Sequence, residues 1–447
     1  MTLRSRKIIM WAFFAAFVLI GPLMLLYTAG YSFNLQKKKI EEVGVLLLNA
    51  LPAGSQLILN DQPQPGSPPW RFNNLRPNYY SIKIIKDGYY SWQKNLEIKP
   101  KASTLAYNIV LFKKTLPTNL IKGDIKSFSF SPDESQLVWT DAAGQIFLKK
   151  KDNIKPIGHL HPTPTTYNLQ PITYNWSNDQ ELLLVGAGTD SLNYRVINLS
   201  DPRETIDLTE LSLGRRLASL RWQPLSSHLL YGLAGQELFK INLLTKAVKK
   251  IAEGVADFTF ADSALYLITK QGLTKYNPLT LGTSLSLIQP LTDHDYAFGP
   301  GFKNYLLIHD LTDRKLLLKN LDKKKESLVT LLGRSADWSK TDFAELLFYY
   351  DANEISALNL TNQETSLVGR YSADLLGAVP VGGAPYVILN VNNELQIAEL
   401  DDRDRRNVET IFKGKNITNL WLDKKGRQLY FLDAIGQEKG IFELELQ

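Results

Sequence analysis

The chain has 447 residues, of which 44% are hydrophobic and 21% are charged, with a formal net charge of +6. This composition excludes a disordered protein, and the absence of cysteine excludes disulfides, thiol catalysis, zinc–thiolate sites and an N-terminal lipid-modified cysteine. The basic residues are spread among acidic neighbours, whereas nucleic-acid-binding proteins concentrate them, so we expect no nucleic-acid partner.

The first predicted element is a membrane-spanning helix in the uncharged apolar stretch from Ile8 to Tyr27. About 20 apolar residues with a rise of 1.5 Å each span a hydrocarbon core of roughly 30 Å. Trp11 near one end, and Tyr27 and Tyr31 near the other, suit the two membrane interfaces. We therefore expect residues 1–36 to form a short cytoplasmic tip and a transmembrane anchor helix.

Two other interpretations of this stretch compete with the anchor. A cleaved signal peptide has an apolar run of only about 7–15 residues before its cleavage site, and Thr28-Ala29-Gly30 matches Ala-x-Ala poorly. A buried core helix would show a polar face, and this stretch has none. The sequence favours an uncleaved anchor without deciding whether cleavage ever occurs.

The basic residues that flank the helix predict its orientation. Arg4, Arg6 and Lys7 precede it without an acidic residue, which favours a cytoplasmic N-terminus and an extracytoplasmic body. Lys37 to Lys39 follow it in a short charged linker and weaken this asymmetry, although Glu41 and Glu42 partly balance them. The prediction is a single-pass protein of the cell membrane.

A small β-domain is expected over residues 43–113, where hydrophobic residues alternate with period two between turn residues. Asn60-Asp61 and Asp87-Gly88 predict tight turns, and a proline-rich loop runs from Pro63 to Pro69. The expected strands are Gly44–Leu48, Gln56–Leu59, Tyr80–Ile84, Asn95–Ile98 and Leu105–Leu111.

This segment resembles a PEGA domain, a small β-sandwich of surface-associated prokaryotic proteins. The resemblance is carried by a family-like Pro-x-Gly-Ala turn and the motifs after it: Pro52-Ala53-Gly54-Ser55, Gln56 to Asp61, Ser67-Pro68, Asn78-Tyr79-Tyr80 and Lys86-Asp87-Gly88-Tyr89. Ser55 departs from the family's Ala, and Asn78 from its Gly. No catalytic residue is known for the family, so the resemblance implies a structural or binding module, often anchored at the cell surface.

Residues 114–447 contain a repeating unit of short apolar strands. Each unit opens on a strand that ends near an aromatic residue and a turn, and the openings are roughly 38–47 residues apart, as in four-stranded propeller blades. We expect a β-propeller of eight blades, because eight units can be counted, with seven blades as the alternative. The seventh unit is degenerate. The openings are Ile125–Asp133, Tyr174–Asp179, Leu220–Pro224, Phe258–Asp262, Tyr296–Pro300, Ala336–Lys340, Leu376–Pro380 and Leu420–Gly426.

The last unit offers only three strands, Thr418–Leu422, Gln428–Leu432 and Ile441–Leu446. Asn119–Ile121, just before the first unit, is expected to add the missing outer strand and close the ring. The stretch Phe130–Asp133 and the Trp-Ser forms resemble TolB-like and WD40-like repeats. That resemblance implies the fold only, since propellers host enzymes, receptors and scaffolds alike.

The candidate chemistry is sparse. His159 and His161 have the spacing of a strand-borne metal pair, and Asp293-His294-Asp295 has ligand residue types, but we interpret both as solvated connections. The chain has no Walker motif, nucleophile elbow or His-Glu-x-x-His. We interpret Gly382-Gly383 as a turn between strands and not as a phosphate-binding loop. The run Asp401–Arg406 is interpreted as a solvated loop with local ion pairs. We therefore predict no catalytic, cofactor-binding or metal residues.

Aromatic residues recur near the unit openings, which favours packing between blades over a ring of sugar-stacking side chains. They are Phe128, Phe130, Trp176, Trp222, Trp338 and Trp421. The function expected from all these features is a non-enzymatic surface protein that binds a protein or a cell-wall polysaccharide. The alternative is a propeller hydrolase or lyase acting on surface glycans or peptides, which needs acidic or histidine side chains converging at one mouth of the ring.

Overall fold

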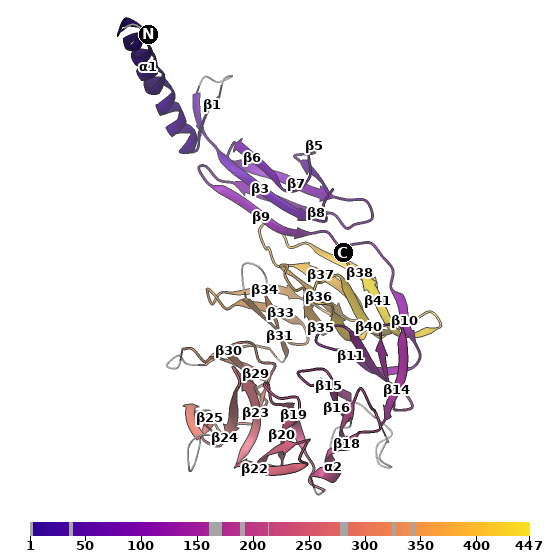
Figure 1. The fold of residues 1–447 in the computed structure, drawn as a ribbon. Coiled ribbons are helices and arrows are strands. Elements are labelled where there is room, and N and C mark those ends of the chain that lie inside the picture. Colours follow the sequence, from indigo (N-terminus) through magenta and orange to yellow (C-terminus); the bar gives the residue numbers. More distant parts are fainter. Residues whose placement is uncertain are drawn as a thin grey trace.

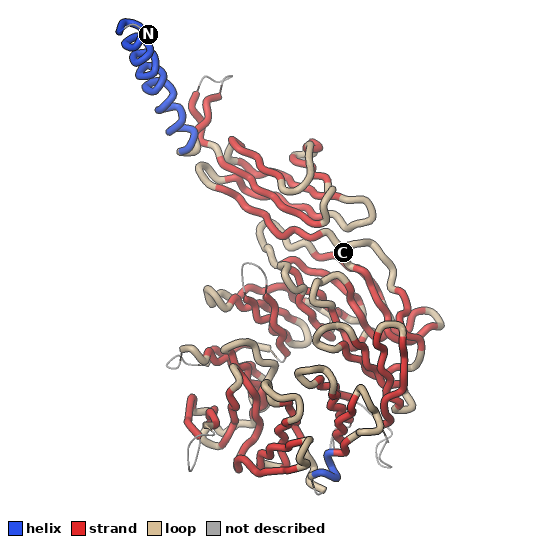
Figure 2. Tube along the Cα trace, in the orientation of Figure 1, coloured by secondary structure: helices blue, strands red, loops and turns tan. Residues whose placement is uncertain are grey.

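The computed structural model describes residues 3–34, 39–160, 172–187, 193–212, 214–277, 285–323, 328–333, 335–340 and 345–447. A helix, a small pair of β-sheets and a ring of β-sheets follow one another along the molecule (Figure 1). Strands dominate the body, as expected for an all-β protein (Figure 2). The C-terminus lies beside the pair of sheets, where the Lys113 amide donates to the Leu446 carbonyl at 2.9 Å.

Helix α1 (Leu3–Thr28) projects from the body. Its segment Ile9–Thr28 is apolar and long enough to cross a membrane, and none of that segment is buried against the rest of the chain. Gly30 then turns the chain with a φ of +79°, and a hairpin follows, made of β1 (Tyr31–Asn34) and β2 (Lys39–Glu42). The sequence predicted a charged linker here, so the hairpin is a correction.

The next part is a β-sandwich of two sheets, ordered β6-β3-β9 and β5-β4-β7-β8. Strand β3 runs parallel to β9 and antiparallel to β6. The expected proline-rich loop contains β5 and is followed by β6. β5 lies at the edge of its sheet, where a proline such as Pro63 is tolerated. The bounds are β3 (Gly44–Leu51), β4 (Gln56–Leu59), β5 (Gln62–Gln64), β6 (Trp70–Leu75), β7 (Asn78–Ile85), β8 (Trp92–Ile98) and β9 (Ser103–Val110).

Alternating side chains of both sheets fill the core of this sandwich. Leu46 and Leu48 from one sheet meet Leu57, Ile82 and Ile84 from the other, and all five are buried. This is the pattern in which inward apolar residues alternate with outward polar ones along each strand.

The ring is an eight-bladed β-propeller, because the remaining strands form eight four-stranded antiparallel sheets. The favoured blade count is therefore confirmed. Blade 1 contains β11 (Ile125–Phe130), β12 (Gln136–Asp141), β13 (Gln145–Lys150) and β14 (Asn153–His159), and blade 2 contains β15 (Ile172–Trp176), β16 (Leu182–Ala187), β17 (Asn193–Asn198) and β18 (Ile206–Asp207), followed by α2 (Leu208–Leu211). Blade 3 contains β19 (Ala218–Trp222), β20 (Leu229–Ala234), β21 (Glu237–Asn242) and β22 (Ala247–Glu253). Blade 4 contains β23 (Val255–Ala261), β24 (Ala264–Thr269), β25 (Gly272–Tyr276) and β26 (Leu285–Gln289).

The unit that looked degenerate in the sequence forms a complete seventh blade. Blade 5 contains β27 (Tyr296–Phe298), β28 (Tyr305–Asp310), β29 (Lys315–Asn320) and β30 (Val329–Leu331), and blade 6 contains β31 (Ser335–Lys340), β32 (Glu345–Tyr350), β33 (Glu354–Asn359) and β34 (Thr365–Arg370). Blade 7 contains β35 (Leu375–Pro380), β36 (Tyr386–Val391), β37 (Glu394–Glu399) and β38 (Val408–Lys413). Blade 8 contains β39 (Thr418–Leu422), β40 (Gln428–Ile435) and β41 (Glu438–Glu445) with β10 (Thr118–Lys122).

The ring is closed as predicted by a strand from the other end of the propeller sequence. Strand β10 pairs antiparallel with β41, with Thr118 opposite Glu443 and Lys122 opposite Gly440. The eighth blade thus has the order β10-β41-β40-β39. No blade is left with a missing outer strand, which would expose unpaired backbone groups and an apolar face.

Hydrophobic clusters fill the joints between neighbouring blades. Between blades 1 and 2, for example, Val138 and Leu148 pack with Leu183 and Val185, and similar clusters join the other blades. Because each cluster takes side chains from two blades, no blade has a core of its own. The hydrophobic effect therefore acts on the ring as a whole.

Candidate functional site

Two places in the body bring polar side chains together: a cleft between the last and first blades, and the junction between sandwich and propeller. The cleft has a volume of about 1010 Å³. Its walls come from the turn before β11, the turn before β39 and the β40–β41 hairpin. The residues that carry its chemistry are Asp124, Lys126, Lys415, Asp433 and Lys439.

Asp433 organises the wall of the cleft formed by the turn before β39. Its carboxylate is buried and accepts hydrogen bonds from the backbone amides of Asn416 at 2.8 Å and Ala434 at 2.7 Å. The Lys415 amide also donates to it, at 3.2 Å. Asp433 is therefore engaged in holding the backbone and is not a free acid or base.

The other charged groups of the cleft differ in whether they form an ion pair. Lys126 pairs with Asp124 at 3.0 Å, so these two charges largely cancel. Lys415 and Lys439 are exposed, and neither forms an ion pair with any residue that the structure describes. Among its described lining residues, the cleft therefore offers two ammonium groups but no free carboxylate pair, which suits recognition of anionic or hydroxyl-rich groups better than general acid–base catalysis.

Amide and hydroxyl side chains form the inner wall of the cleft. The Ser127 hydroxyl donates to the Asn419 side-chain oxygen at 3.1 Å, and the Asn419 amide donates to the Phe128 carbonyl at 3.1 Å. A second cavity of about 500 Å³ shares Asn416, Thr418 and Asn419 and extends toward blade 7. The polar surface therefore continues across three neighbouring blades.

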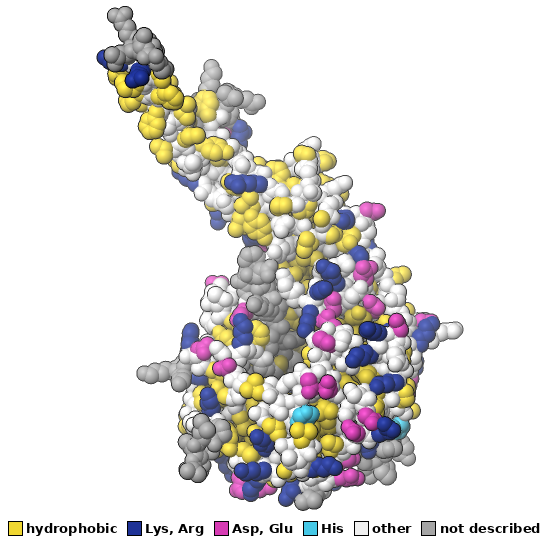
Figure 3. Space-filling view, in the orientation of Figure 1, with side chains coloured by type: hydrophobic (Ala, Val, Ile, Leu, Met, Phe, Trp, Pro, Cys, Tyr) yellow, Lys and Arg dark blue, Asp and Glu magenta, His cyan; other side chains and the backbone are white. Residues whose placement is uncertain are grey.

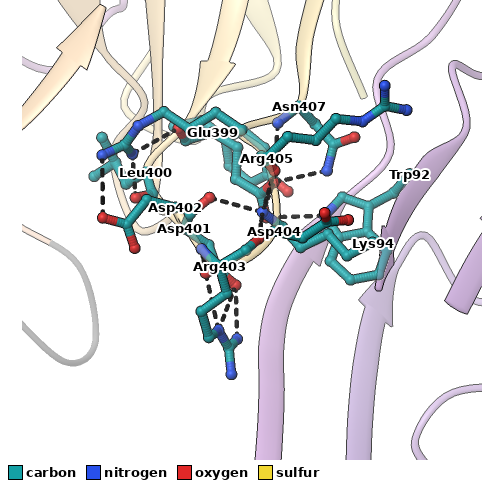
Figure 4. Close-up of polar contacts among 12 residues, drawn as sticks. Trp92, Lys94, Glu399, Leu400, Asp401, Asp402, Arg403, Asp404, Arg405 and Asn407 are labelled. Carbon is teal, nitrogen blue, oxygen red and sulfur yellow. Dashed lines mark hydrogen bonds and ion pairs between the residues drawn. The ribbon is translucent and has the colours of Figure 1, made fainter. Parts of the chain in front are cut away.

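The junction between sandwich and propeller is centred on Lys94 of β8, whose side chain is 0% exposed. Its ammonium donates to the carbonyls of Asp401 at 2.7 Å, Arg403 at 3.0 Å and Arg405 at 2.7 Å. It also lies 3.2 Å from a carboxylate oxygen of Glu399 (Figure 4). Three donors therefore meet three carbonyls, and the charge is neutralised inside the interface, as burial requires.

The loop that receives Lys94 is held in shape by its own side chains. Arg403 pairs with Asp401 at 2.6 Å, and its hydrogen bonds lower the Asp401 pKa although burial acts to raise it. Trp92 and Asn407 each donate to the Glu399 carboxylate at 2.8 Å. The sequence interpretation was correct about the loop and its local ion pairs, but it missed that the loop carbonyls line a buried socket.

A hydrophobic contact extends the junction beyond this socket. Val110 and Phe112, at and just beyond the end of β9, belong to the same cluster as Tyr386 and Leu446 of the propeller. The rings of Phe112 and Tyr386 meet edge to face at 5.1 Å, and the Tyr386 hydroxyl accepts from the Val110 amide at 3.2 Å. The sandwich and propeller are thus joined by both apolar and charged contacts.

The histidine candidates are dispersed. His159 ends β14, whereas its expected partner His161 lies outside the described residues. His294 lies 2.9 Å from Asp310 and, with Asp313, forms a group whose ligand atoms lie within 4.8 Å of one another. Lys315 pairs with Asp313 at 2.9 Å, and the Thr312 and Asp313 amides donate to Asp310. These partners make the group an ion-pair network.

This network predicts a pH-dependent contribution to stability. The hydrogen bond to Asp310 raises the pKa of His294 in the folded protein. The stabilisation from this bond is therefore complete below about pH 6.5 and is lost as the pH rises through the pKa of the folded protein. Burial raises the Asp310 pKa, but hydrogen bonds from Asp313 and His294 lower it more, so its contribution is lost in acid. His294→Gln should therefore destabilise more near about pH 5 than near about pH 8 in thermal melts. In an Asp310→Asn background, this difference between the two pH values should vanish.

The recurring aromatic residues lie between blades, as expected. Phe128 is buried, and Phe130 stacks on Trp421 across the joint between blades 1 and 8 at 4.2 Å. The indole groups of Trp176 and Trp222 donate to Ser129 and Asn175 of the preceding blades. The side chain of Trp338 lies outside the described part of the chain.

No protein-family model matches the chain, and no curated protein matches it in sequence. Among solved structures it is similar to the Dos1 propeller, with a TM-score of 0.50 and 11% identity over 75% of this chain and 96% of that one. It is also similar to BamB from Moraxella catarrhalis, with a TM-score of 0.48, 12% identity and coverage of 74% and 100%. The RRP9 WD40 repeats give a TM-score of 0.43, 10% identity and coverage of 74% and 97%. At 11% identity the likeness to the Dos1 propeller shows the fold alone, a β-propeller.

Proposed function

We propose that the chain is a non-catalytic, single-pass membrane protein that displays its propeller as a binding platform at the cell surface. Its N-terminus is cytoplasmic, α1 is an uncleaved anchor, and the sandwich is a PEGA-type module that carries the propeller outside the membrane. The ligand is a protein or a cell-envelope polymer. The apolar α1, with no burial over Ile9–Thr28, supports the anchor, and the resemblance of residues 43–113 supports the surface location.

The observation that carries the binding role is the cleft at blades 8 and 1. It combines about 1010 Å³ of space with the ammonium groups of Lys415 and Lys439, which form no ion pair with any described residue, while Asp124 and Asp433 are engaged by Lys126 and by backbone amides. Such a surface recognises anionic or hydroxylated groups, such as acidic side chains or an acidic polysaccharide. The described residues that line it do not include the opposed free carboxylates of a glycosidase.

Binding assays on the full chain in nanodiscs test this role. We expect glycan arrays or pull-downs to identify a ligand whose binding is weakened roughly tenfold or more by Lys415→Ala with Lys439→Ala, and more weakly held as salt rises. The matched control is Lys270→Ala with Lys425→Ala, which removes two exposed lysines outside the cleft. Turnover of a glycan or peptide by the wild-type chain would contradict the proposal and support the hydrolase or lyase alternative.

A further inference from the structure

The β1–β2 hairpin next to α1 presents an exposed apolar pair. Phe33 lies opposite Ile40 in the register, and Ser32 lies opposite Glu41. Because side chains alternate along a strand, Phe33 and Ile40 share one face with Tyr31 and Glu42 at the base of the hairpin. Ser32 and Glu41 lie on the other face. Phe33 is 55% exposed and Ile40 is 53% exposed, so nothing in the described chain covers this apolar pair.

The base of the hairpin is fixed to the sandwich. Glu41 pairs with Arg76 at 3.1 Å, and Glu42 pairs with Lys101 at 2.8 Å. The Lys101 ammonium also lies 4.4 Å from the centre of the Tyr31 ring. The Val43 amide donates to the Gly30 carbonyl at 2.8 Å. These contacts hold the apolar pair at a set orientation relative to the sandwich.

The hairpin is also continuous with the anchor. α1 ends at Thr28 and β1 begins at Tyr31, so Phe33 follows the predicted membrane span within a few residues, and Ile40 lies opposite it in the hairpin. Figure 3 shows hydrophobic side chains along α1, with Lys and Arg side chains where α1 meets the sandwich. Arg71 and Lys101 line a cavity of about 490 Å³ beside the end of α1. Basic side chains beside an apolar surface are typical of protein that rests in the headgroup region.

We propose that the exposed pair Phe33 and Ile40 of the β1–β2 hairpin inserts into the interfacial region of the bilayer that α1 spans, making a second membrane contact. The inference rests on the proposed anchor and deepens it. The occupant of the exposed face is phospholipid, at the depth where headgroups meet acyl chains, with Phe33 and Ile40 in the apolar layer and Ser32 and Glu41 on the aqueous side. Since one helix alone leaves a body free to rotate and tilt, this second contact sets the angle of the sandwich to the membrane.

Spin-label depth measurements on the full chain in phosphatidylcholine vesicles test this proposal. The natural sequence has no cysteine, so single substitutions give specific nitroxide labelling at Phe33→Cys, Ile40→Cys, Ser32→Cys, Phe17→Cys and Leu225→Cys. Collisions with oxygen, which concentrates in the bilayer, are compared with collisions with a water-soluble nickel chelate. Phe17 reports the anchor, and Leu225 reports an exposed propeller position.

We expect the ratio of oxygen to nickel collisions to be highest at position 17. At positions 33 and 40 the ratio should be severalfold above that at the propeller position 225. At position 32 it should be lower than at position 33. If positions 33 and 40 match position 225 while 17 is in the bilayer, the second contact is overturned and the anchor stands. If position 17 also matches 225, both the anchor and the second contact are overturned. Labels at 33 and 40 each leave the other apolar residue in place, so neither variant removes the whole face.

Discussion

Replacing Lys94 with methionine should destabilise the body by about 3–5 kcal/mol and uncouple the sandwich from the propeller. The substitution preserves much of the side-chain volume but leaves the Glu399 carboxylate, which is 4% exposed, without its cation. The carbonyls of Asp401, Arg403 and Arg405 also lose their shared donor. A buried charge without a partner costs more than the wild-type pair contributes.

Calorimetry of the full chain in detergent measures this effect. The wild type should unfold its sandwich and propeller together, whereas Lys94→Met should show a separate transition at lower temperature. Lys99→Met is the matched control, because Lys99 is exposed and forms no ion pair with the described residues of the sandwich or propeller. A single unshifted transition for Lys94→Met would show that the junction holds without the Lys94 socket, through its other contacts such as that of Phe112 with Tyr386.

Gly440→Ala should open the ring at its closing blade, at a cost of about 3 kcal/mol or more. Gly440 has a φ of +148°, and a Cβ there would lie 1.9 Å from the Ile121 carbonyl oxygen. That oxygen belongs to the backbone of β10, so the strand itself must shift. The pairing of β10 with β41 would therefore be lost first.

Hydrogen exchange locates this loss. Amides of β10 and β41 should exchange roughly a hundredfold faster in Gly440→Ala, since about 1.4 kcal/mol corresponds to a factor of ten, while amides of blades 3 to 6 change little. Gly436→Ala is the control on the same hairpin. Its φ is +61° with no atom near a built Cβ, so it should cost only about 1 kcal/mol. Equally faster amide exchange in all eight blades would argue against local opening at β10 and β41.

The fold was largely readable from the sequence because a propeller repeats one local rule. Period-two apolar runs between turns predicted the strands of each blade, and β39 has the predicted bounds, Thr418–Leu422. The closing role of β10 followed from an unpartnered strand at the start and a missing one at the end. Leu376–Pro380 looked degenerate because Gly377 and Pro380 replace the usual polar and aromatic residues, yet packing against its neighbours forms β35.

The junction and the cleft depend on contacts between residues far apart in the chain, which no local pattern specifies. One signal for Lys94 was present. In β8 it alternates with Trp92, Leu96 and Ile98, so it lies on the buried face. A lysine at such a position predicts a buried partner, but the partner loop lies 307 residues away for the Asp401 carbonyl. The cleft lysines gave no signal, because nothing in the sequence distinguishes Lys415 and Lys439 from other exposed lysines.

The closing blade also sets an order of events during synthesis. Asn119 of β10 and Lys439 of β41 are 320 residues apart. At roughly 5–20 residues per second, about 15–65 s pass between the emergence of the first and of the second. During that interval β10 is an unpaired strand edge, open to mispairing with other chains, while the sandwich that precedes it is already complete. A product that stops before β41 never closes its ring, because β10 then has no partner strand in the eighth blade.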